Sequence, residues 1–121
     1  MIRILMLAVL STFSWGAYAQ SLGRHIMHGT WYGLRDGSSS RTADGTRFSA
    51  HNPSICAAPY WLPFGARLRI TNRINKRVLH CTVHDRGRLG RSTIDVTYGG
   101  SRILRMPGTA PLLVEVLSRS R

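Results

Sequence analysis

Acidic residues are scarce in this 121-residue chain, which has five Asp and Glu residues against 17 Lys and Arg. The formal net charge is therefore +12, and Lys76 is the only lysine. A surface with this balance favours an anionic partner. The arginines are spread from Arg24 to Arg121 and do not collect in one tail, so the charge alone does not specify nucleic acid as that partner.

The sequence also lacks an apolar run long enough to cross a bilayer as a helix. Its first residues instead read "MIR", then the apolar "ILMLAVLSTF", then "SWGAYA". This layout is typical of a secretory signal peptide over residues 1–19, with cleavage expected before Gln20. A buried N-terminal helix is the alternative. Removing residues 1–19 takes only Arg3 from the basic residues and leaves a net charge of +11.

An exported chain meets the polymers of the cell envelope first, in the periplasm or outside the cell, so nucleic acid is not an expected partner. Only Cys56 and Cys81 are present, and neither lies near the cleavage point, so no lipid anchor is indicated. Two cysteines in a small exported domain fit one disulfide. Two free buried thiols are the alternative, because spacing does not establish a contact.

About a hundred residues remain after the signal peptide, enough for one small domain with one modest core. We expect a polar lead over 20–28 and a first strand at "HGTWYG", followed by a long exposed loop over 34–54. Residues 66–72 and 77–85 alternate apolar and polar side chains and are joined by "RINK", which predicts a hairpin. Further strands are expected at "STIDV" and "PLLVEVL", with a short helix capped by Thr97 between them. This pattern predicts an all-β fold, a small β-barrel with one short helix.

Asp85 is the best candidate for acid–base chemistry. Cleavage of a glycosidic bond needs a proton donor for the leaving oxygen, usually a carboxylic acid in a partly apolar site. Asp85 ends its strand and shares the parity of the apolar side chains, which predicts that it points toward the core side. Three arginines follow it and would lower its pKa if they pointed inward: Arg86, Arg88 and Arg91.

The other acids have simpler interpretations. Asp36 and Asp44 lie in Asp-Gly turn dipeptides, and Glu115 alternates outward in the last strand. Asp95, inside an apolar strand, is expected to be a buried structural carboxylate paired with an arginine or with backbone donors.

The sequence gives little support for a metal site or for a catalytic serine or cysteine. His25 and His28 are three apart, while His80 and His84 share a strand face but lie roughly 13 Å apart along it, too far for one ion. No Gly-x-Ser-x-Gly motif occurs, and a disulfide accounts for both cysteines. We therefore expect no metal and no cofactor. Tyr60 and three further aromatic residues could stack on sugar rings or fill the core: Trp31, Tyr32 and Trp61.

Six segments occur in the order "GTWYG", "SSRTADGTRF", "LPFGARLRITN", "HDRG", "IDVTYGG" and "VEVL". In this order and spacing they resemble the rare lipoprotein A family over residues 29–117, which leaves 118–121 as a C-terminal tail. The resemblance implies a six-stranded double-psi β-barrel of the barwin and expansin type. It also implies an envelope location and lytic transglycosylase activity on naked peptidoglycan glycan strands, which leaves 1,6-anhydromuramic acid ends.

Carried over by motif, the family's catalytic aspartate is Asp85, serving as both acid and base. The family's glutamate is replaced by Thr46, and its histidine falls at Pro59. Expansins share this barrel type, loosen wall polysaccharides without measurable cutting, and use an aspartate beside a threonine, which Thr46 and Asp85 resemble. Five residues are expected to contact the glycan: Thr46, Tyr32, Trp31, Arg86 and Trp61.

Three readings of function remain open. The first is an exported peptidoglycan transglycosylase with Asp85 as acid and base. The second is a non-catalytic glycan-binding or wall-loosening module, favoured by Thr46 and Pro59. The third is a basic exported protein with another host or bacterial target. A monomer is the default expectation for each.

Overall fold

The computed structural model describes residues 21–87 and 90–119. The predicted signal peptide, its cleavage site and Arg88 lie outside these residues. Within them, no helix has the length and apolar character needed to cross a bilayer.

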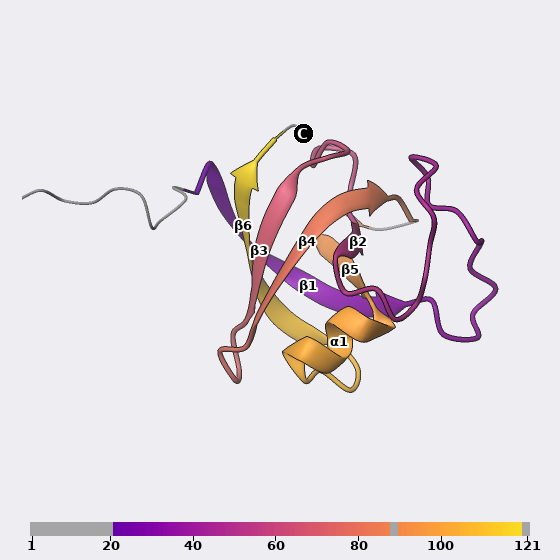
Figure 1. Ribbon diagram of the computed structural model, residues 1–121. Coiled ribbons are helices and arrows are strands. Elements are labelled where there is room, and N and C mark those ends of the chain that lie inside the picture. Colours follow the sequence, from indigo (N-terminus) through magenta and orange to yellow (C-terminus); the bar gives the residue numbers. More distant parts are fainter. Residues whose placement is uncertain (1–20, 88–89, 120–121) are drawn as a thin grey trace, which may run out of the picture.

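The described chain forms a closed barrel with one short helix at its side (Figure 1). Around the barrel the strand order is β1-β5-β2-β4-β3-β6, with β1–β5 and β2–β4 parallel and the other neighbours antiparallel. The predicted small β-barrel with one short helix is therefore confirmed. Its elements are β1 (Gly23–Tyr32), β2 (Ile55–Ala57), β3 (Arg67–Asn72), β4 (Val78–Asp85), β5 (Thr93–Thr97), α1 (Tyr98–Leu104) and β6 (Ala110–Ser118).

The barrel interior is filled by the apolar side of each strand. Leu68 and Ile70 of β3 are at most 1% exposed, whereas Arg67 and Arg69, which alternate with them, face outward. The outward Glu115 of β6 lies opposite Arg69, and its Oε1 accepts a hydrogen bond from Arg69 Nε at 3.2 Å. This confirms the outward direction predicted for Glu115. Alternation of apolar and polar side chains is thus what orients β3, β4 and β6.

The predicted hairpin and the predicted helix cap are both present. Thr71 of β3 pairs with Val78 of β4 across the short "RINK" turn. The Thr97 hydroxyl caps α1 by accepting a hydrogen bond from the Gly100 amide at 3.1 Å, and it donates to Asn52 O at 2.7 Å. The cap therefore also ties the long loop to the helix start.

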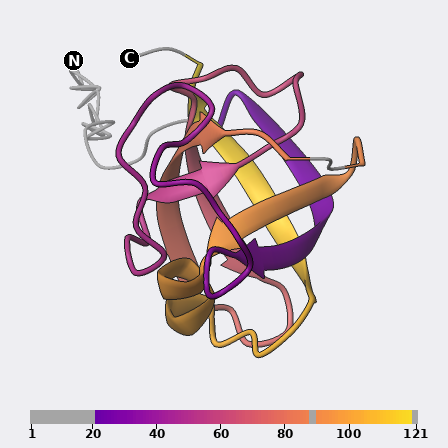
Figure 2. The ribbon, with the colours of Figure 1, turned by 90° about the vertical axis from the view of Figure 1, so that its right-hand side faces the viewer.

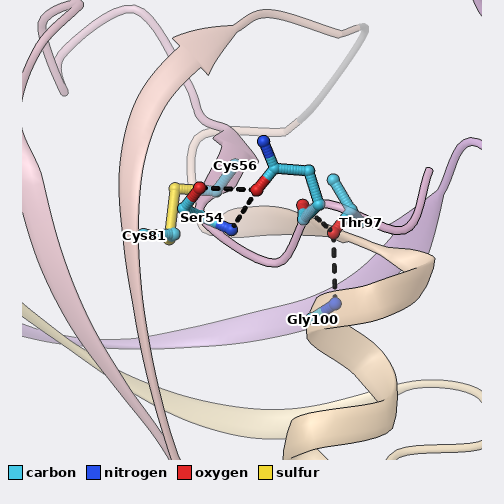
Figure 3. The surroundings of a disulfide bond; sticks show 6 residues. Ser54, Cys56, Cys81, Thr97 and Gly100 are labelled. Atoms are coloured by element: carbon cyan, nitrogen blue, oxygen red, sulfur yellow. Dashed lines mark hydrogen bonds between the residues drawn. A yellow bond between two sulfur atoms is a disulfide. The ribbon is translucent and has the colours of Figure 1, made fainter. Parts of the chain in front are cut away.

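The disulfide joins β2 to β4 through Cys56 and Cys81, whose Cα atoms are 5.9 Å apart (Figure 3). Both cysteines are buried, and the described part of the chain has no free cysteine. Of the two alternatives left open by the sequence, the disulfide is confirmed and the free thiols are wrong.

Two strands differ from the expectation. β1 begins at Gly23, inside the segment expected to be a polar lead, because its first residues pair with β6 from Val116 back to Pro111. β2 has only three residues and was not predicted, since so short an apolar run carries no periodicity. The long connection between β1 and β2 lies beside the barrel, on the side that faces the viewer in Figure 2.

Candidate active site

A β-bulge places Asp85 at the end of β4. The pairing of β2 with β4 puts Cys56 opposite Val83 and Ala57 opposite Asp85, so that His84 is an extra residue. Asp85 therefore leaves the alternation that buries Val83, and it lies on the same face of the sheet as Ala57 and its other partner, Asp95. The expectation that Asp85 points to the core side is wrong, because strand parity does not survive a bulge.

Three donors converge on the Asp85 carboxylate. The Tyr32 hydroxyl donates to Oδ2 at 2.7 Å, while the amides of Ala43 and Arg86 both donate to Oδ1 at 2.9 Å. Tyr32 ends β1, and Ala43 belongs to the long loop, so the carboxylate is fixed by three separate segments. Burial and the neighbouring Asp85 carboxylate raise the pKa of the Tyr32 hydroxyl well above its usual value. Tyr32 therefore stays protonated as a donor to Asp85.

A hollow of about 220 Å³ opens at this point. Its walls come from the end of β1, the long loop and the end of β4, and its lining residues are Tyr32, Ser38, Ser39, Arg41, Phe48, Asp85 and Arg86. Tyr32 and Phe48 stack with ring centroids 5.3 Å apart, so one wall is aromatic. The hollow thus combines a carboxylate, two guanidinium groups, hydroxyls and an aromatic wall.

Arg86 is tied to the loop between β2 and β3 by its guanidinium group. Its Nη1 donates to the carbonyls of Ala58 at 3.1 Å and Pro59 at 3.3 Å, and its Cζ lies 4.1 Å from the centroid of the Phe64 ring. Burial lowers the pKa of Arg86 from its usual value. The positive charge beside Asp85 is therefore held in place by the "APYWLPF" loop.

Asp95 lies two strands away from Asp85 in the same row of the sheet. Ala57 of β2 pairs with Asp85 on one side and with Asp95 on the other. Asp95 Oδ1 accepts a hydrogen bond from the Thr30 hydroxyl at 2.9 Å. Burial raises the pKa of Asp95 to about 6, against the effect of the Thr30 bond and with help from the charges of Asp36 and Asp85. The partner expected for Asp95 was an arginine or a backbone donor, and the structure has a threonine hydroxyl instead.

Asp44 does more than serve its turn. It accepts a hydrogen bond from the Thr46 amide at 3.1 Å, as a turn residue would, but its Oδ2 also lies 2.7 Å from Nδ1 of His84. Burial would raise the pKa of Asp44, yet hydrogen bonds from Thr46, His84 and Thr42 outweigh it and hold the pKa well below its usual value. This contact joins residues that are forty positions apart, and no sequence motif predicts it. Asp36, in contrast, accepts from the amides of Gly33 and Ser38, which is the turn role predicted for it.

The residues predicted to contact glycan are only partly brought together. Tyr32 and Arg86 line the hollow with Asp85, whereas the Thr46 hydroxyl lies 3.2 Å from His84 Nδ1. Within the described residues no hydrogen bond joins Thr46 to Asp85. The threonine and aspartate are thus linked through the loop and through His84.

Trp31 and Trp61 lie elsewhere. Trp31 Nε1 donates to Pro107 O at 3.2 Å, and the ring lines a separate hollow of about 470 Å³ beside α1, together with Tyr98 and Arg102. Trp61 Nε1 donates to Arg91 O at 2.9 Å. Both rings also pack against the core. The core role that the sequence left open is therefore confirmed for Trp31 and Trp61.

No cluster of three or more His, Cys, Asp or Glu side chains that could hold a metal ion occurs in residues 21–87 and 90–119.

Two curated proteins resemble the chain in sequence. It is 42% identical over 94 residues to the probable endolytic peptidoglycan transglycosylase RlpA of Nostoc sp., an alignment that covers 74% of this chain and 25% of the relative. It is 36% identical over 76 residues to the protein of the same description from Synechocystis sp., with 62% and 23% covered. The chain thus spans about a quarter of the length of these relatives. No family model matches the chain.

Solved structures share the fold. The Streptomyces papain inhibitor superposes with a TM-score of 0.64 at 17% identity, over 81% of this chain and 97% of the inhibitor. The apo expansin of Clavibacter michiganensis gives a TM-score of 0.62 at 14% identity, over 82% and 52%. An aspartate-to-asparagine mutant of that expansin, in complex with cellohexaose, gives 0.57 at 16% identity, over 78% and 50%. At these identities the likeness concerns the fold alone, and it confirms the six-stranded double-psi β-barrel.

Proposed function

Because the chain is a homologue of the RlpA proteins built on a double-psi β-barrel, we propose that it is an exported lytic transglycosylase of peptidoglycan glycan strands. The observation that carries the proposal is the Asp85 carboxyl group, which lines an open hollow and is held by Tyr32, Ala43 and Arg86. A disulfide formed in an oxidising compartment supports export.

In the proposed reaction, the Asp85 carboxyl group protonates the glycosidic oxygen as the bond from the muramic C1 to that oxygen breaks. The resulting carboxylate then removes the proton of the muramic C6 hydroxyl as its oxygen bonds to C1. The product carries a 1,6-anhydro ring, and no water is consumed. One carboxyl group can serve both steps, which differs from the two-carboxylate arrangement of ordinary glycoside hydrolases.

The surroundings of Asp85 suit an anionic sugar polymer. Arg41 and Arg86 line the hollow and would attract the lactyl carboxylates of naked strands, from which the stem peptides are absent. The stacked rings of Tyr32 and Phe48 offer an apolar wall to a sugar ring. Trp31 and Trp61, at a distance from this hollow, would contact only parts of a strand farther from the cleaved bond.

A non-catalytic glycan-binding or wall-loosening module is the second candidate. It is supported by the substitution of Thr46 and Pro59 for the two further polar residues that the family resemblance predicts. The chain shares its fold with an expansin, and one structure of that expansin is a complex with cellohexaose. On this reading the hollow binds a strand without breaking it.

Digestion of purified, stem-peptide-free glycan strands separates the two candidates. Mass spectrometry of the products would show 1,6-anhydromuramic acid ends for the wild type. Asp85→Asn should lower their rate of formation by at least about 100-fold, on the order of 3 kcal/mol of barrier, because the proton donor is lost. Glu115→Gln, which changes a carboxylate on the outer wall of the barrel, is the matched control and should keep full activity. Retained strand binding without new ends in the wild type would support the binding module and exclude the enzyme.

A further inference from the structure

His84 is a second group beside Asp85 that can transfer a proton, and the mechanism above leaves it unused. It is the extra residue of the β4 bulge and directly precedes Asp85. Its side chain is 20% exposed, whereas that of Asp44, its partner, is 6% exposed. The imidazole is thus partly open to solvent and contacts a nearly buried carboxylate.

One ring nitrogen of His84 is firmly held. Nδ1 lies 2.7 Å from Asp44 Oδ2 and 3.2 Å from the Thr46 hydroxyl oxygen. Because the low pKa of Asp44 keeps its carboxylate ionised, Oδ2 can only accept at this contact, and Nδ1 must carry the proton. In the neutral ring the other nitrogen, Nε2, is then a bare acceptor.

Nε2 is available to a substrate. Within the described residues it makes no hydrogen bond, and it is not a buried polar atom left without a partner. A carboxylate that fixes Nδ1–H while Nε2 stays open is the arrangement that orients an imidazole as a general base.

A single segment of the long loop holds both groups. The Ala43 amide donates to Asp85 Oδ1, and the next residue, Asp44, binds His84 through its side chain and donates its amide to the His84 carbonyl at 3.1 Å. The loop therefore fixes His84 and Asp85 relative to each other at the rim of the same sheet end.

We propose that His84, oriented by Asp44, is the base that removes the proton of the C6 hydroxyl, while Asp85 supplies the proton to the glycosidic oxygen. This inference rests on the proposed function and divides between two residues the work first assigned to Asp85 alone. As the bond from C1 to the leaving oxygen breaks, that oxygen takes the Asp85 proton. As O6 bonds to C1, its proton passes to His84 Nε2. The imidazolium ion then returns a proton to the Asp85 carboxylate through solvent, which restores both groups.

The test uses His84→Ala, with His80→Ala as the matched control. His80 lies on the same strand and is exposed, and replacing it should leave activity unchanged. The rate of formation of 1,6-anhydromuramic acid ends should fall by about 100-fold in His84→Ala, and added imidazole should restore at least a tenth of the wild-type rate. Asp44→Asn should lower the rate by roughly tenfold, because the ring loses its orienting carboxylate. Thermal unfolding of each variant checks that it is folded, and His84→Gln replaces the alanine variant if the latter does not fold.

The outcomes separate this inference from the proposed function. A wild type that forms anhydro ends, with a His84 variant within threefold of its rate, would overturn the role of His84 and leave the transglycosylase standing. A folded His84→Ala whose loss imidazole does not restore would overturn the base role as well. A wild type that forms no anhydro ends would refute both proposals together.

Discussion

At the scale of single residues, Asp95 should lower the stability of the barrel at neutral pH. Burial raises its pKa from the ordinary 3.8 to about 6, so the folded state binds the proton more tightly than the unfolded chain does. Below about pH 3 the group is protonated in both states, and its burial costs nothing. As the pH rises from about 3 through 6, the unfolded chain ionises first, and the folded state loses up to about 3 kcal/mol of stability relative to it.

Asp95→Asn removes that cost, since the amide oxygen can still accept the hydrogen bond from Thr30. We expect its free energy of unfolding in urea to exceed that of the wild type by up to about 3 kcal/mol at pH 7.5 and to equal it at about pH 3. Glu115→Gln should behave in the opposite sense, because Arg69 lowers the pKa of Glu115 and its charge stabilises the fold. An Asp95→Asn difference that is the same at both pH values would contradict the prediction.

The sequence identifies some residues of the site and misses others for a definable reason. Asp85, Tyr32 and Arg86 were predicted by their motifs, and the structure places all three at one hollow. The Asp44–His84 contact was missed because it joins a turn to a strand, and only the folded loop brings the two together. The direction of Asp85 was wrong because a single extra residue in β4 reverses strand parity, and nothing local in the sequence marks it.

At the scale of elements, the start of α1 depends on Gly99, although glycine has a low helix propensity. A Cβ on Gly99 would lie 2.4 Å from the carbonyl oxygen of His51 and 2.7 Å from its carbonyl carbon. These are backbone atoms of the long loop, and the Gly99 amide donates to Ala50 O at 2.8 Å in the same contact. The glycine therefore lets the loop approach the helix start closely.

Gly99→Ala should destabilise the protein by about 1 to 3 kcal/mol, because either the loop or the helix must shift. Gly108→Ala is the control, since a Cβ there meets nothing within 4 Å, and its effect should be close to zero. Chemical unfolding of both variants measures the difference. Equal stabilities for the two would show that the loop yields without cost.

Elements with clear alternation were the ones that the sequence predicted. The β3–β4 hairpin, β5, β6 and the Thr97 cap were all expected from local pattern, and each is present. The short β2 was missed because its pairing with β4 and β5 depends on distant partners. The first half of β1 was missed because the residues before Met27 include no buried apolar side chain, and Met27 pairs with Leu112 of β6.

At the scale of the whole molecule, the Cys56–Cys81 disulfide restrains the unfolded chain between positions 25 residues apart. The chain-entropy estimate for a loop of this length is about 3.5 kcal/mol of stabilisation. The double variant Cys56→Ala/Cys81→Ala should therefore unfold at a lower urea concentration, with a loss of about 3 kcal/mol. Wild-type protein unfolded in the presence of a reductant should lose a similar amount, whereas the double variant should not respond to it. A reductant effect on the double variant would assign the change to something other than this bond.

The pairing of β6 on both sides has a consequence for the order of folding. β6 lies between β1 and β3, so a chain that ends before Ala110 exposes two unpaired strand edges at once. Such edges invite pairing with other chains, and the contact of β1 with β6 spans nearly the whole described sequence, which makes its formation slow. The barrel therefore closes only after β6 is available, so a chain threaded from its N-terminus through a membrane could not complete the barrel until β6 had crossed.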